Sequence, residues 1–286
     1  MPQLNFRSLR TTDTSQMYQA FQEAFSDYAV SFEMTEEEFY KKFVEKLNIN
    51  LDLSIGAFDK EKLVGFIFTS IAKYNGKLTA YNGGTGVTPE CRGQHIPAKI
   101  YELLIPKLRK EGVEQCVLEV ITTNAKAVMV YEKIGFKKLD FYHCFKLKEI
   151  VEGNRQADKI RIIKKDSIDW SELTNCIDFE PSFLDTDFLL EKNLKNEQVI
   201  VALAGKEVVG YAIYQSHGRI SQMGVAKHRR KQGVGSALIN FIYNDTGSLQ
   251  LTVLNIPKTE NGAMHFLEKV GFENQINQYE MVLAID

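Results

Sequence analysis

A basic loop containing two glycines stands between a predicted strand and a predicted helix in the second half of the sequence. The apolar strand residues end at Val225, three consecutive basic residues begin at Arg229, and Gly233 and Gly235 lead into a helix with periodic apolar residues. Glycine lets the backbone approach a ligand closely, and the first amides of a helix lack partners inside it and favour an anion. The segment therefore has the chemistry of a pyrophosphate-binding loop.

A related loop at residues 87–98 in the first half departs from this pattern. It keeps Arg92 and Gln94, but His95 and Pro97 replace the two glycines. Proline is tolerated in a first helical turn but has no N–H to donate. One lost donor weakens an anion contact by about 1–3 kcal/mol. We therefore expect weaker phosphate binding by the first loop.

A tyrosine in the first half shows the opposite asymmetry. Residues 118–136 (LEVITTNAKAVMVYEKIGF) place Tyr131 on a predicted helix that follows a strand. A phenol is a neutral proton donor at pH 7. The matching position in the second half is Leu267, which has no proton to donate. The better phosphate loop and the better acid thus lie in different halves.

These segments belong to an internal repeat. The Gly-Val pair at 86–87 recurs at 224–225, and Arg92 and Gln94 recur as Arg230 and Gln232, all at an offset of 138 positions. Farther along, the block at 132–136 (EKIGF) recurs at 268–272 (EKVGF) at an offset of 136. Two blocks in the same order indicate a duplication.

Each copy is predicted to alternate strands and helices in the same order. The first copy has strands at 4–9, 53–58, 63–72, 78–87, 115–121 and 141–147, and helices spanning 98–110 and 125–133. Two further helices are predicted to begin near Asp13, whose side chain can cap the helix, and near Thr35, where the sequence TEEE has the form of a capping box. The second has strands at 159–163, 198–204, 207–215, 220–225, 249–254 and 278–284, and helices within 167–194 and at 235–243 and 261–269. The polar stretch 148–158 is typical of a linker. We expect an α/β (α+β) protein with domains at 1–150 and 157–286.

The loop and the downstream block together resemble a known family. The Arg-x-x-Gly-x-Gly pattern at 230–235, with the block at 268–272, resembles the acyl-CoA loop of the GCN5-related N-acetyltransferase (GNAT) superfamily. The first copy's segment ending in Tyr-Glu-Lys-x-Gly-Phe resembles the family's fifth strand and following helix. The resemblance implies two tandem GNAT-like domains. Each would be a mixed, mostly antiparallel sheet with splayed fourth and fifth strands, flanked by helices.

The resemblance also implies site residues and a direct transfer reaction. An amine would attack the acetyl-CoA thioester, backbone N–H on the fourth strand would hold the oxyanion, and Tyr131 would protonate the thiolate. No general base is evident, and Glu119, His217, Tyr81 and ordered water stay open. The residues expected to bind acetyl-CoA are Val225, Arg230, Lys231, Gln232, Gly233, Val234, Gly235 and Ser236 in the second copy, and Val87, Arg92, Gly93, Gln94, His95, Ile96, Ala98 and Asn124 in the first.

Composition excludes several other classes. With 35 Lys and Arg against 37 Asp and Glu, the net charge of −2 gives no general attraction to nucleic acid or acidic membranes. No apolar run has the length of a signal peptide core or a membrane span, so we expect a cytoplasmic protein. The four cysteines lack metal-ligand spacing, so reduced thiols and no metal are expected. The loop spacing fits neither a Rossmann dinucleotide motif nor a P-loop.

Three functions are compatible with these features. The favoured one is an N-acetyltransferase acting on a small-molecule or peptide amine, with no nucleic-acid or membrane partner and with homo-oligomerisation left open. The alternative is a non-catalytic acyl-CoA-binding sensor or regulatory protein, because the motif set is split between the copies. A third is an aminoacyl transferase that uses charged tRNA, which the slightly acidic composition disfavours.

Overall fold

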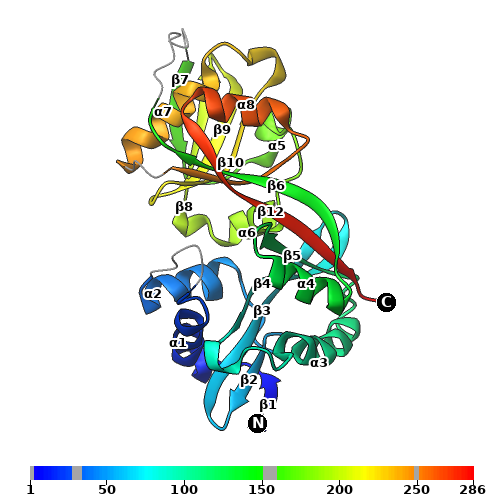
Figure 1. Cartoon of the computed structure of the whole chain (residues 1–286). Coiled ribbons are helices and arrows are strands. Elements are labelled where there is room, and N and C mark those ends of the chain that lie inside the picture. Colours follow the sequence, from blue (N-terminus) through cyan, green and yellow to red (C-terminus); the bar gives the residue numbers. More distant parts are fainter. Residues whose placement is uncertain (1–2, 28–33, 151–159, 248–250) are drawn as a thin grey trace. The chain divides into compact units, whose positions relative to one another are not determined.

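The chain forms two compact units. The computed structural model describes residues 3–27, 34–150, 160–247 and 251–286, so most of the predicted linker at 148–158 lies outside the described residues. The first unit comprises Met1–Leu139 together with Tyr279–Asp286, and the second comprises Asp140–Gln278 (Figure 1). Each unit is a mixed α/β assembly of strands flanked by helices, in agreement with the predicted fold class.

The first unit is a mixed sheet whose neighbouring strands are mostly antiparallel. β1 to β4 pair consecutively and antiparallel, β5 runs parallel to β4, and the C-terminal part of β12 lies beside β5. The strands are β1 (Asn5–Ser8), β2 (Ile55–Asp59), β3 (Lys62–Tyr74), β4 (Lys77–Val87), β5 (Gln115–Ile121) and β12 (Phe272–Ala284).

Helices cover both faces of this sheet. On one face lie α1 (Thr14–Ala24), α2 (Glu36–Phe39) and the π-helical turn Tyr40–Lys46 that continues α2, and their phenylalanines contact those of β3: Phe21, Phe39, Phe43, Phe66 and Phe68. On the other lie α3 (Ile96–Lys110) and α4 (Ala125–Ile134), which share an apolar core with β2, β3 and β5. Alternate residues of a strand face opposite sides of the sheet. This determines which side chains of β4 and β5 reach which layer.

Two predicted helix starts have different outcomes. The capping box at Thr35 is confirmed, since its hydroxyl accepts from the Glu38 N–H at 3.2 Å and the Glu38 carboxylate accepts from the Thr35 N–H at 2.7 Å. The predicted side-chain cap by Asp13 is wrong. A 3₁₀ turn at Thr11–Asp13 precedes α1, and the Asp13 carboxylate instead accepts from the Arg10 N–H and from Arg7 at 2.8 and 2.6 Å.

The second unit repeats this order. β7 to β10 pair consecutively and antiparallel, β11 runs parallel to β10, β6 pairs antiparallel with β11, and the first part of β12 lies beside β6. The strands are β6 (Lys137–Leu147), β7 (Ile160–Lys165), β8 (Glu197–Ala204), β9 (Glu207–Gln215), β10 (Arg219–Val225) and β11 (Thr252–Pro257). The helices are α5 (Trp170–Leu173) and α6 (Asp187–Lys192) on one face, and α7 (Val234–Thr246) and α8 (Asn261–Lys269) on the other.

The units differ from the contiguous domains 1–150 and 157–286 because two strands are exchanged. From Asp140 onward β6 belongs to the second unit, where the Leu147 N–H donates to the Leu251 carbonyl at 2.8 Å. From Tyr279 onward β12 belongs to the first unit, where the Ile285 N–H donates to the Glu114 carbonyl at 3.0 Å. Each unit is therefore completed by a strand encoded in the other half of the sequence.

Candidate active site

In the first unit, β4 and β5 separate part-way along their length. Their parallel ladder runs from the pair Thr79–Gln115 to the pair Tyr81–Val117, and both strands continue beyond it. The backbone beyond this point has N–H and C=O groups that the neighbouring strand does not use. Such an opening can pair with an extended ligand much as an added strand would. The splayed fourth and fifth strands that the family resemblance implied are present.

A β-bulge lies at the start of this opening. The register between β3 and β4 passes from Thr69–Asn82 directly to Phe68–Gly84, so Gly83 has no opposite residue. A Cβ at Gly83 would lie 2.0 Å from Leu47 Cδ2, so any larger residue here would have to displace the Leu47 side chain. Beyond the bulge, N–H groups of β4 that face the side where β5 has separated are candidate donors to an oxyanion.

A tyrosine and a glutamate meet beside the bulge. The Tyr81 hydroxyl donates a hydrogen bond to the Glu119 carboxylate, so the last residue of the β4 ladder is joined to β5 just beyond the ladder. Leu118 and Val120 point into the core under α3 and α4. Glu119 therefore faces the opposite side, toward the layer of α1 and α2. The carboxylate is partly exposed, as a proton acceptor must be.

Tyr131 lies on α4, which follows β5 after a tight turn. Its ring is partly buried at the edge of the first unit's core and packs edge-to-face on Phe136, with ring centroids 5.7 Å apart. The matching residue of the second unit, Leu267, is 3 % exposed and belongs to that unit's core. At this position of the repeat, the first unit thus has a phenol and the second has a buried aliphatic side chain.

The two phosphate loops have the same backbone conformation despite their different sequences. In the first, Gly93 and His95 have φ of 79° and 57°; in the second, Lys231 and Gly233 have φ of 60° and 86°. These are equivalent positions of the repeat, so each loop places one glycine and one other residue in the left-handed region. A non-glycine residue there costs about 1–3 kcal/mol. The loss of glycine at His95 has therefore not changed the path of the loop.

The arginines of both loops are engaged within the protein. Arg92 Nε donates to the Val87 carbonyl at 3.3 Å, and its guanidinium donates twice to Asp27, at 2.6 and 2.7 Å. That guanidinium holds the pKa of Asp27 below its ordinary value. Arg230 repeats the arrangement, with its Nε on the Val225 carbonyl at 3.1 Å and its guanidinium on Asp178. Each arginine thus ties its loop to a segment earlier in the chain, which contains Asp27 in the first unit and Asp178 in the second.

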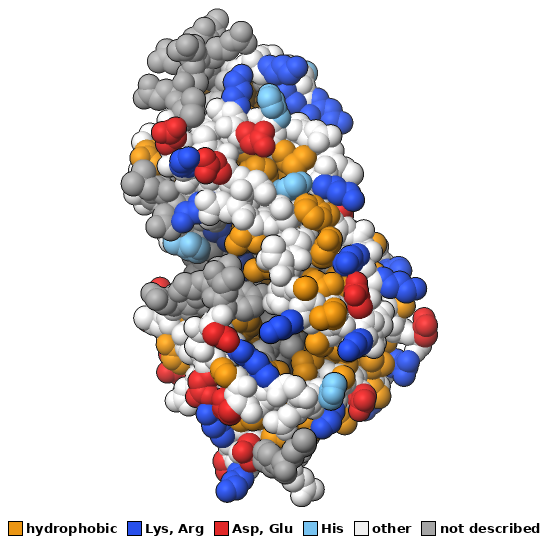
Figure 2. Space-filling view, viewed as in Figure 1, with side chains coloured by type: hydrophobic (Ala, Val, Ile, Leu, Met, Phe, Trp, Pro, Cys, Tyr) orange, Lys and Arg blue, Asp and Glu red, His pale blue; other side chains and the backbone are white. Residues whose placement is uncertain are grey.

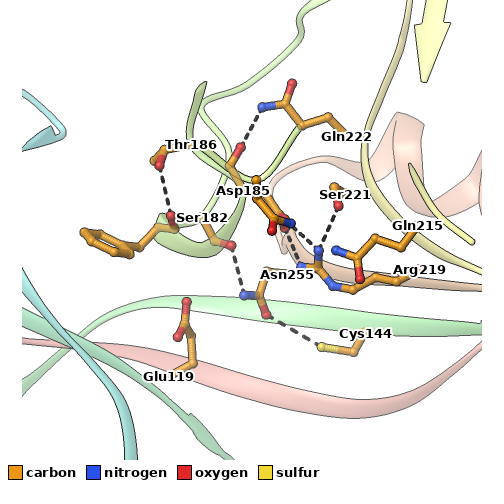
Figure 3. A network of polar contacts seen from close by, with 12 residues as sticks. Glu119, Cys144, Ser182, Asp185, Thr186, Gln215, Arg219, Ser221, Gln222 and Asn255 are labelled. Atoms are coloured by element: carbon orange, nitrogen blue, oxygen red, sulfur yellow. Dashed lines mark hydrogen bonds and ion pairs between the residues drawn. The ribbon is translucent and has the colours of Figure 1, made fainter. Parts of the chain in front are cut away.

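In the second unit, an ion pair and its neighbours lie where β10 and β11 separate. The Arg219 guanidinium donates to both carboxylate oxygens of Asp185 at 2.8 Å, and the two side chains are 12 % and 4 % exposed. Gln222 Nε2 donates to the Asp185 carbonyl at 2.7 Å, and Asn255 Nδ2 donates to Ser182 Oγ at 3.0 Å (Figure 3). The segment from Ser182 to Asp185 is therefore fastened to both separating strands.

This network occupies the repeat positions of the first unit's pair. Arg219 matches Tyr81 at the offset of 138, and Asn255 matches Glu119 at the offset of 136. Among the described residues the β10–β11 ladder is one pair shorter, with Arg219–Thr252 and Ile220–Val253, and the register break at Ser221 matches the bulge at Gly83. The strand geometry is shared, but the side chains at the opening are not.

Comparisons with known proteins agree with this geometry. The family model of the acetyltransferase (GNAT) family matches residues 14–136, and that of the acetyltransferase (GNAT) domain matches residues 195–274. The ribosomal protein bS18-alanine N-acetyltransferase of Escherichia coli is 30 % identical over 131 residues, which cover 46 % of this chain and 79 % of that protein. N-alpha-acetyltransferase 30 of Schizosaccharomyces pombe is 26 % identical over 100 residues, 34 % of this chain and 67 % of that one.

A solved structure extends the likeness to the whole chain. A tandem GNAT protein from the clavulanic acid biosynthesis pathway superposes with a TM-score of 0.74 over 99 % of each chain, at 10 % identity. This chain belongs to the GNAT acetyltransferase superfamily. It is a tandem member, because two family domains lie in one polypeptide.

The GNAT loop residues named from the sequence fall into two groups. Ile96 and Val234 are 1 % exposed and pack in the cores, so only their backbone can face a ligand. The others are partly or fully exposed on the loops or the first helical turns: Val87, Arg92, Gly93, Gln94, His95 and Ala98, and Val225, Arg230, Lys231, Gln232, Gly233, Gly235 and Ser236. Their contact with acetyl-CoA stays a prediction.

Two of these residues also have structural roles in the GNAT units. Asn124 is the N-cap of α4, where its side chain accepts from the Ala127 N–H at 3.1 Å. A Cβ at Gly235 would lie 2.8 Å from the Phe266 ring, so this glycine lets α7 pack against α8. A larger residue at Gly235 would therefore have to displace the Phe266 ring, whether or not a ligand approaches the loop.

Sequence reasoning did not find the bulge or the ion-pair network of the second unit. The signal for the bulge was the run Asn82-Gly83-Gly84 inside a predicted strand, since glycine in a strand interior often marks one. The pairing of Arg219 with Asp185 joins residues 34 positions apart and had no local signal. Within the described ranges, no helix is long and apolar enough to span a bilayer, and no three metal-ligand side chains converge.

Proposed function

We propose that the protein is an acetyl-CoA-dependent N-acetyltransferase whose first unit carries out the transfer. The observation that carries this proposal is the Tyr81–Glu119 pair beside the bulge at the point where β4 and β5 separate. The second unit has Arg219 and Asn255 at these positions, and both are engaged by the segment around Asp185. Only the first unit combines a partly exposed carboxylate with a tyrosine at the family's acid position.

Acetyl-CoA suits the backbone of the first unit. The pantetheine arm would pair with the unused edges of β4 and β5, and the pyrophosphate would face the loop at the N-terminus of α3. Pro97 leaves that helix start one amide short, but the left-handed positions at Gly93 and His95 keep the loop in the conformation of its repeat. The donor would thus bind here with one contact fewer than in the second unit.

Each catalytic group has a defined part in the proposed transfer. The amine nitrogen attacks the thioester carbon, a C–N bond forms and the C–S bond breaks. Glu119 accepts the proton that the amine loses, an N–H of β4 beyond the ladder donates to the oxyanion, and Tyr131 gives a proton to the departing CoA sulfur. Solvent then returns a proton to Tyr131 and removes the one on Glu119.

The acceptor class follows from the same side of the sheet. Glu119 faces the layer of α1 and α2, so a primary amine on a small molecule or peptide would enter there. The relatives named for alanine N-acetyltransferase and N-alpha-acetyltransferase activities support a peptide α-amine as the first acceptor to test. A tRNA-dependent reaction is disfavoured by the net charge of −2 and by the interspersed acidic and basic side chains on the face in Figure 2.

The second unit suits a different role, acyl-CoA binding without transfer. Its loop keeps Gly233 at φ 86° and offers the Gly235 amide, while Leu267 stands at the family's acid position and Arg219 and Asn255 stand at the positions of Tyr81 and Glu119. Such a unit would bind the donor as a structural or regulatory ligand.

A direct test measures CoA release from acetyl-CoA with a panel of amines that includes alanine-first peptides. Glu119→Gln should lower kcat by about 10²–10⁴-fold, because the amine proton loses its acceptor. The matched control is Glu197→Gln, which makes the same change at a glutamate that is 5 % exposed on β8 of the second unit. Its network with Gln215 and Ser221 is structural, so it should lower stability but leave kcat unchanged.

Wild-type protein that binds acetyl-CoA but releases no CoA with any amine would contradict the transferase proposal and favour the sensor. Turnover that survives in Glu119→Gln and is lost in Glu197→Gln would move the reaction to the second unit. Calorimetry with CoA separates these cases from a protein that does not bind the donor at all.

A further inference from the structure

A buried asparagine has all of its hydrogen-bonding groups engaged around the bulge of the first unit. Asn82 is 5 % exposed. Its Nδ2 donates to Thr85 Oγ1 at 2.8 Å and to the Tyr101 hydroxyl at 2.9 Å. Its Oδ1 accepts from the Gly84 N–H and from Thr85 Oγ1, both at 3.1 Å. A side-chain amide held from both ends has one orientation.

The bond from the Gly84 N–H closes a turn across Gly83. An asparagine that accepts from the amide two residues later forms an Asx turn, which replaces the ladder as the constraint on the backbone. Gly83 is the one bulged residue between the register pairs of Asn82 and Gly84, and Tyr81 ends the ladder with β5. Asn82 therefore fixes the direction of the Gly83 peptide at the start of the opening.

Asn82 is itself held from the neighbouring helix. The Tyr101 side chain comes from α3, is 1 % exposed, and reaches Asn82 from the core side of the sheet. Burial raises the pKa of Tyr101 well above its ordinary value, so the phenol stays neutral wherever the enzyme is assayed. Because α3 also begins at the phosphate loop, one helix supports both the loop and the bulge.

The second unit has no counterpart of this arrangement. The residue matching Asn82 is Ile220, which is 1 % exposed and packs in the core of that unit. The bulge residue there is Ser221, whose hydroxyl donates to Glu197 Oε2 at 3.0 Å. Of the two matching positions, only the one in the unit with the Tyr81–Glu119 pair has the Asx turn. This is the unit for which we propose the transfer, where the path of the β4 backbone through the bulge matters.

We propose that Asn82, held by Tyr101, is a positioning residue that sets the path of β4 through the bulge and so aims the first β4 N–H groups beyond the ladder at the oxyanion of the acetyl transfer. The inference rests on the proposed function of the first unit. It assigns Asn82 no contact with either substrate. It predicts that loss of the side-chain amide affects the chemical step and leaves donor binding intact.

The test compares three variants in steady-state turnover and thermal unfolding. Asn82→Ala should lower kcat by about 10–100-fold, because a catalytic donor displaced by an ångström costs about that much, while KM for acetyl-CoA stays within about twofold. Tyr101→Phe removes one hydroxyl and should lower kcat by a smaller factor. Tyr214→Phe is the matched control, since it removes a fully buried phenol that donates to Asp245 in the second unit at 2.7 Å. It should lower the Tm without lowering kcat.

A second readout does not depend on turnover. Amide hydrogen exchange at Gly84 should be at least about tenfold faster in Asn82→Ala, because its acceptor is gone. Unchanged exchange, an unchanged kcat, or a kcat loss matched by Tyr214→Phe would each overturn the inference while leaving the transferase proposal in place. If Asn82→Ala does not fold, Tyr101→Phe decides by the same criteria. Wild-type protein without any transfer would overturn both, and the Glu119→Gln series identifies that case.

Discussion

Where the fourth and fifth strands of each sheet separate, the first unit carries Tyr81 and Glu119, and the second carries Arg219 and Asn255. The two openings share the short parallel ladder, the bulge and the path of the phosphate loop. In the first unit the side chains at the opening are a phenol and a partly exposed carboxylate. In the second they are a buried ion pair and an amide fastened to Ser182.

This difference separates the two requirements of the reaction. In the proposed reaction, donor binding depends mainly on the loop backbone, whose path is the same in both units although His95 and Lys231 are not glycines. Proton transfer would depend on Glu119 and Tyr131, and the matching positions of the second unit hold Asn255 and Leu267. Under this proposal, the second unit keeps the ligand-binding geometry without the side chains that catalyse the transfer.

The largest effect is expected at the family's acid position. Tyr131→Phe should lower kcat by about 10²–10⁴-fold at saturating acetyl-CoA, because the departing thiolate loses its proton donor. Leu267→Met makes a volume-conserving change at the matching position of the second unit and should leave kcat unchanged. Both are measured as CoA release under saturating substrates.

Equal kcat in Tyr131→Phe and wild type would remove the general acid from the first unit. A thiolate could then depart without protonation by the protein, and the comparison between the units would rest on Glu119 alone. A loss of kcat in Leu267→Met, with the Tm unchanged, would assign the chemistry to the second unit.

The next effect concerns stability and tests whether the second opening is structural. Arg219→Met should lower the free energy of unfolding by about 3–5 kcal/mol, because Asp185 keeps a charge that is 4 % exposed and has lost its partner. Arg219→Met with Asp185→Leu removes both charges and should recover much of that loss. Denaturant unfolding measures both values.

The kcat of the same variants tests whether the second opening takes part in the reaction. We expect kcat per folded molecule to equal that of the wild type in both, since neither residue belongs to the transfer in the first unit. A kcat that falls with Arg219→Met and is not restored by the double variant would show that this opening takes part in the reaction.

Much of the fold follows from the sequence, because strand and helix periods are local. The helix predicted at 98–110 is α3 at Ile96–Lys110, and the capping box at Thr35 forms as predicted. The exchange of β6 and β12 was not predictable, because strand periodicity does not specify which sheet a strand joins. Tyr74 in the first unit donates to Glu280 at 2.7 Å, a contact across 206 positions that no local pattern encodes.

The candidate site was predictable to the extent that it follows a repeat motif. The loops and Tyr131 came from blocks that recur or match a family pattern. Glu119 is one of several candidate bases in the sequence, and its hydrogen bond with Tyr81 is visible only in the structure. The role proposed for Asn82 could not be predicted, because it depends on Tyr101, which a separate helix brings to the bulge.

The smallest effect tests the weaker loop of the first unit. Pro97 stands in the first turn of α3, where the matching Gly235 of the second unit has an N–H. Pro97→Ala should restore that donor and lower KM for acetyl-CoA by about five- to tenfold, which corresponds to about 1–1.4 kcal/mol, the low end of the roughly 1–3 kcal/mol for one anion contact. Steady-state turnover reports on the first unit alone in this proposal, because acetyl-CoA that binds to the second unit is not consumed.

Replacing proline by alanine also increases the conformational entropy of the unfolded chain, which can lower the stability of the protein. The Tm of the variant should therefore be measured together with its kinetics. Pro106→Ala inside the same helix is the control, because it changes the same residue type away from the loop and should leave KM unchanged. A fall in KM confined to Pro97→Ala means that the first loop contacts the donor phosphates through its backbone amides. An unchanged KM in both variants means that the phosphates of the reacting donor lie elsewhere, and the similarity of the two loops then reflects shared ancestry without shared use.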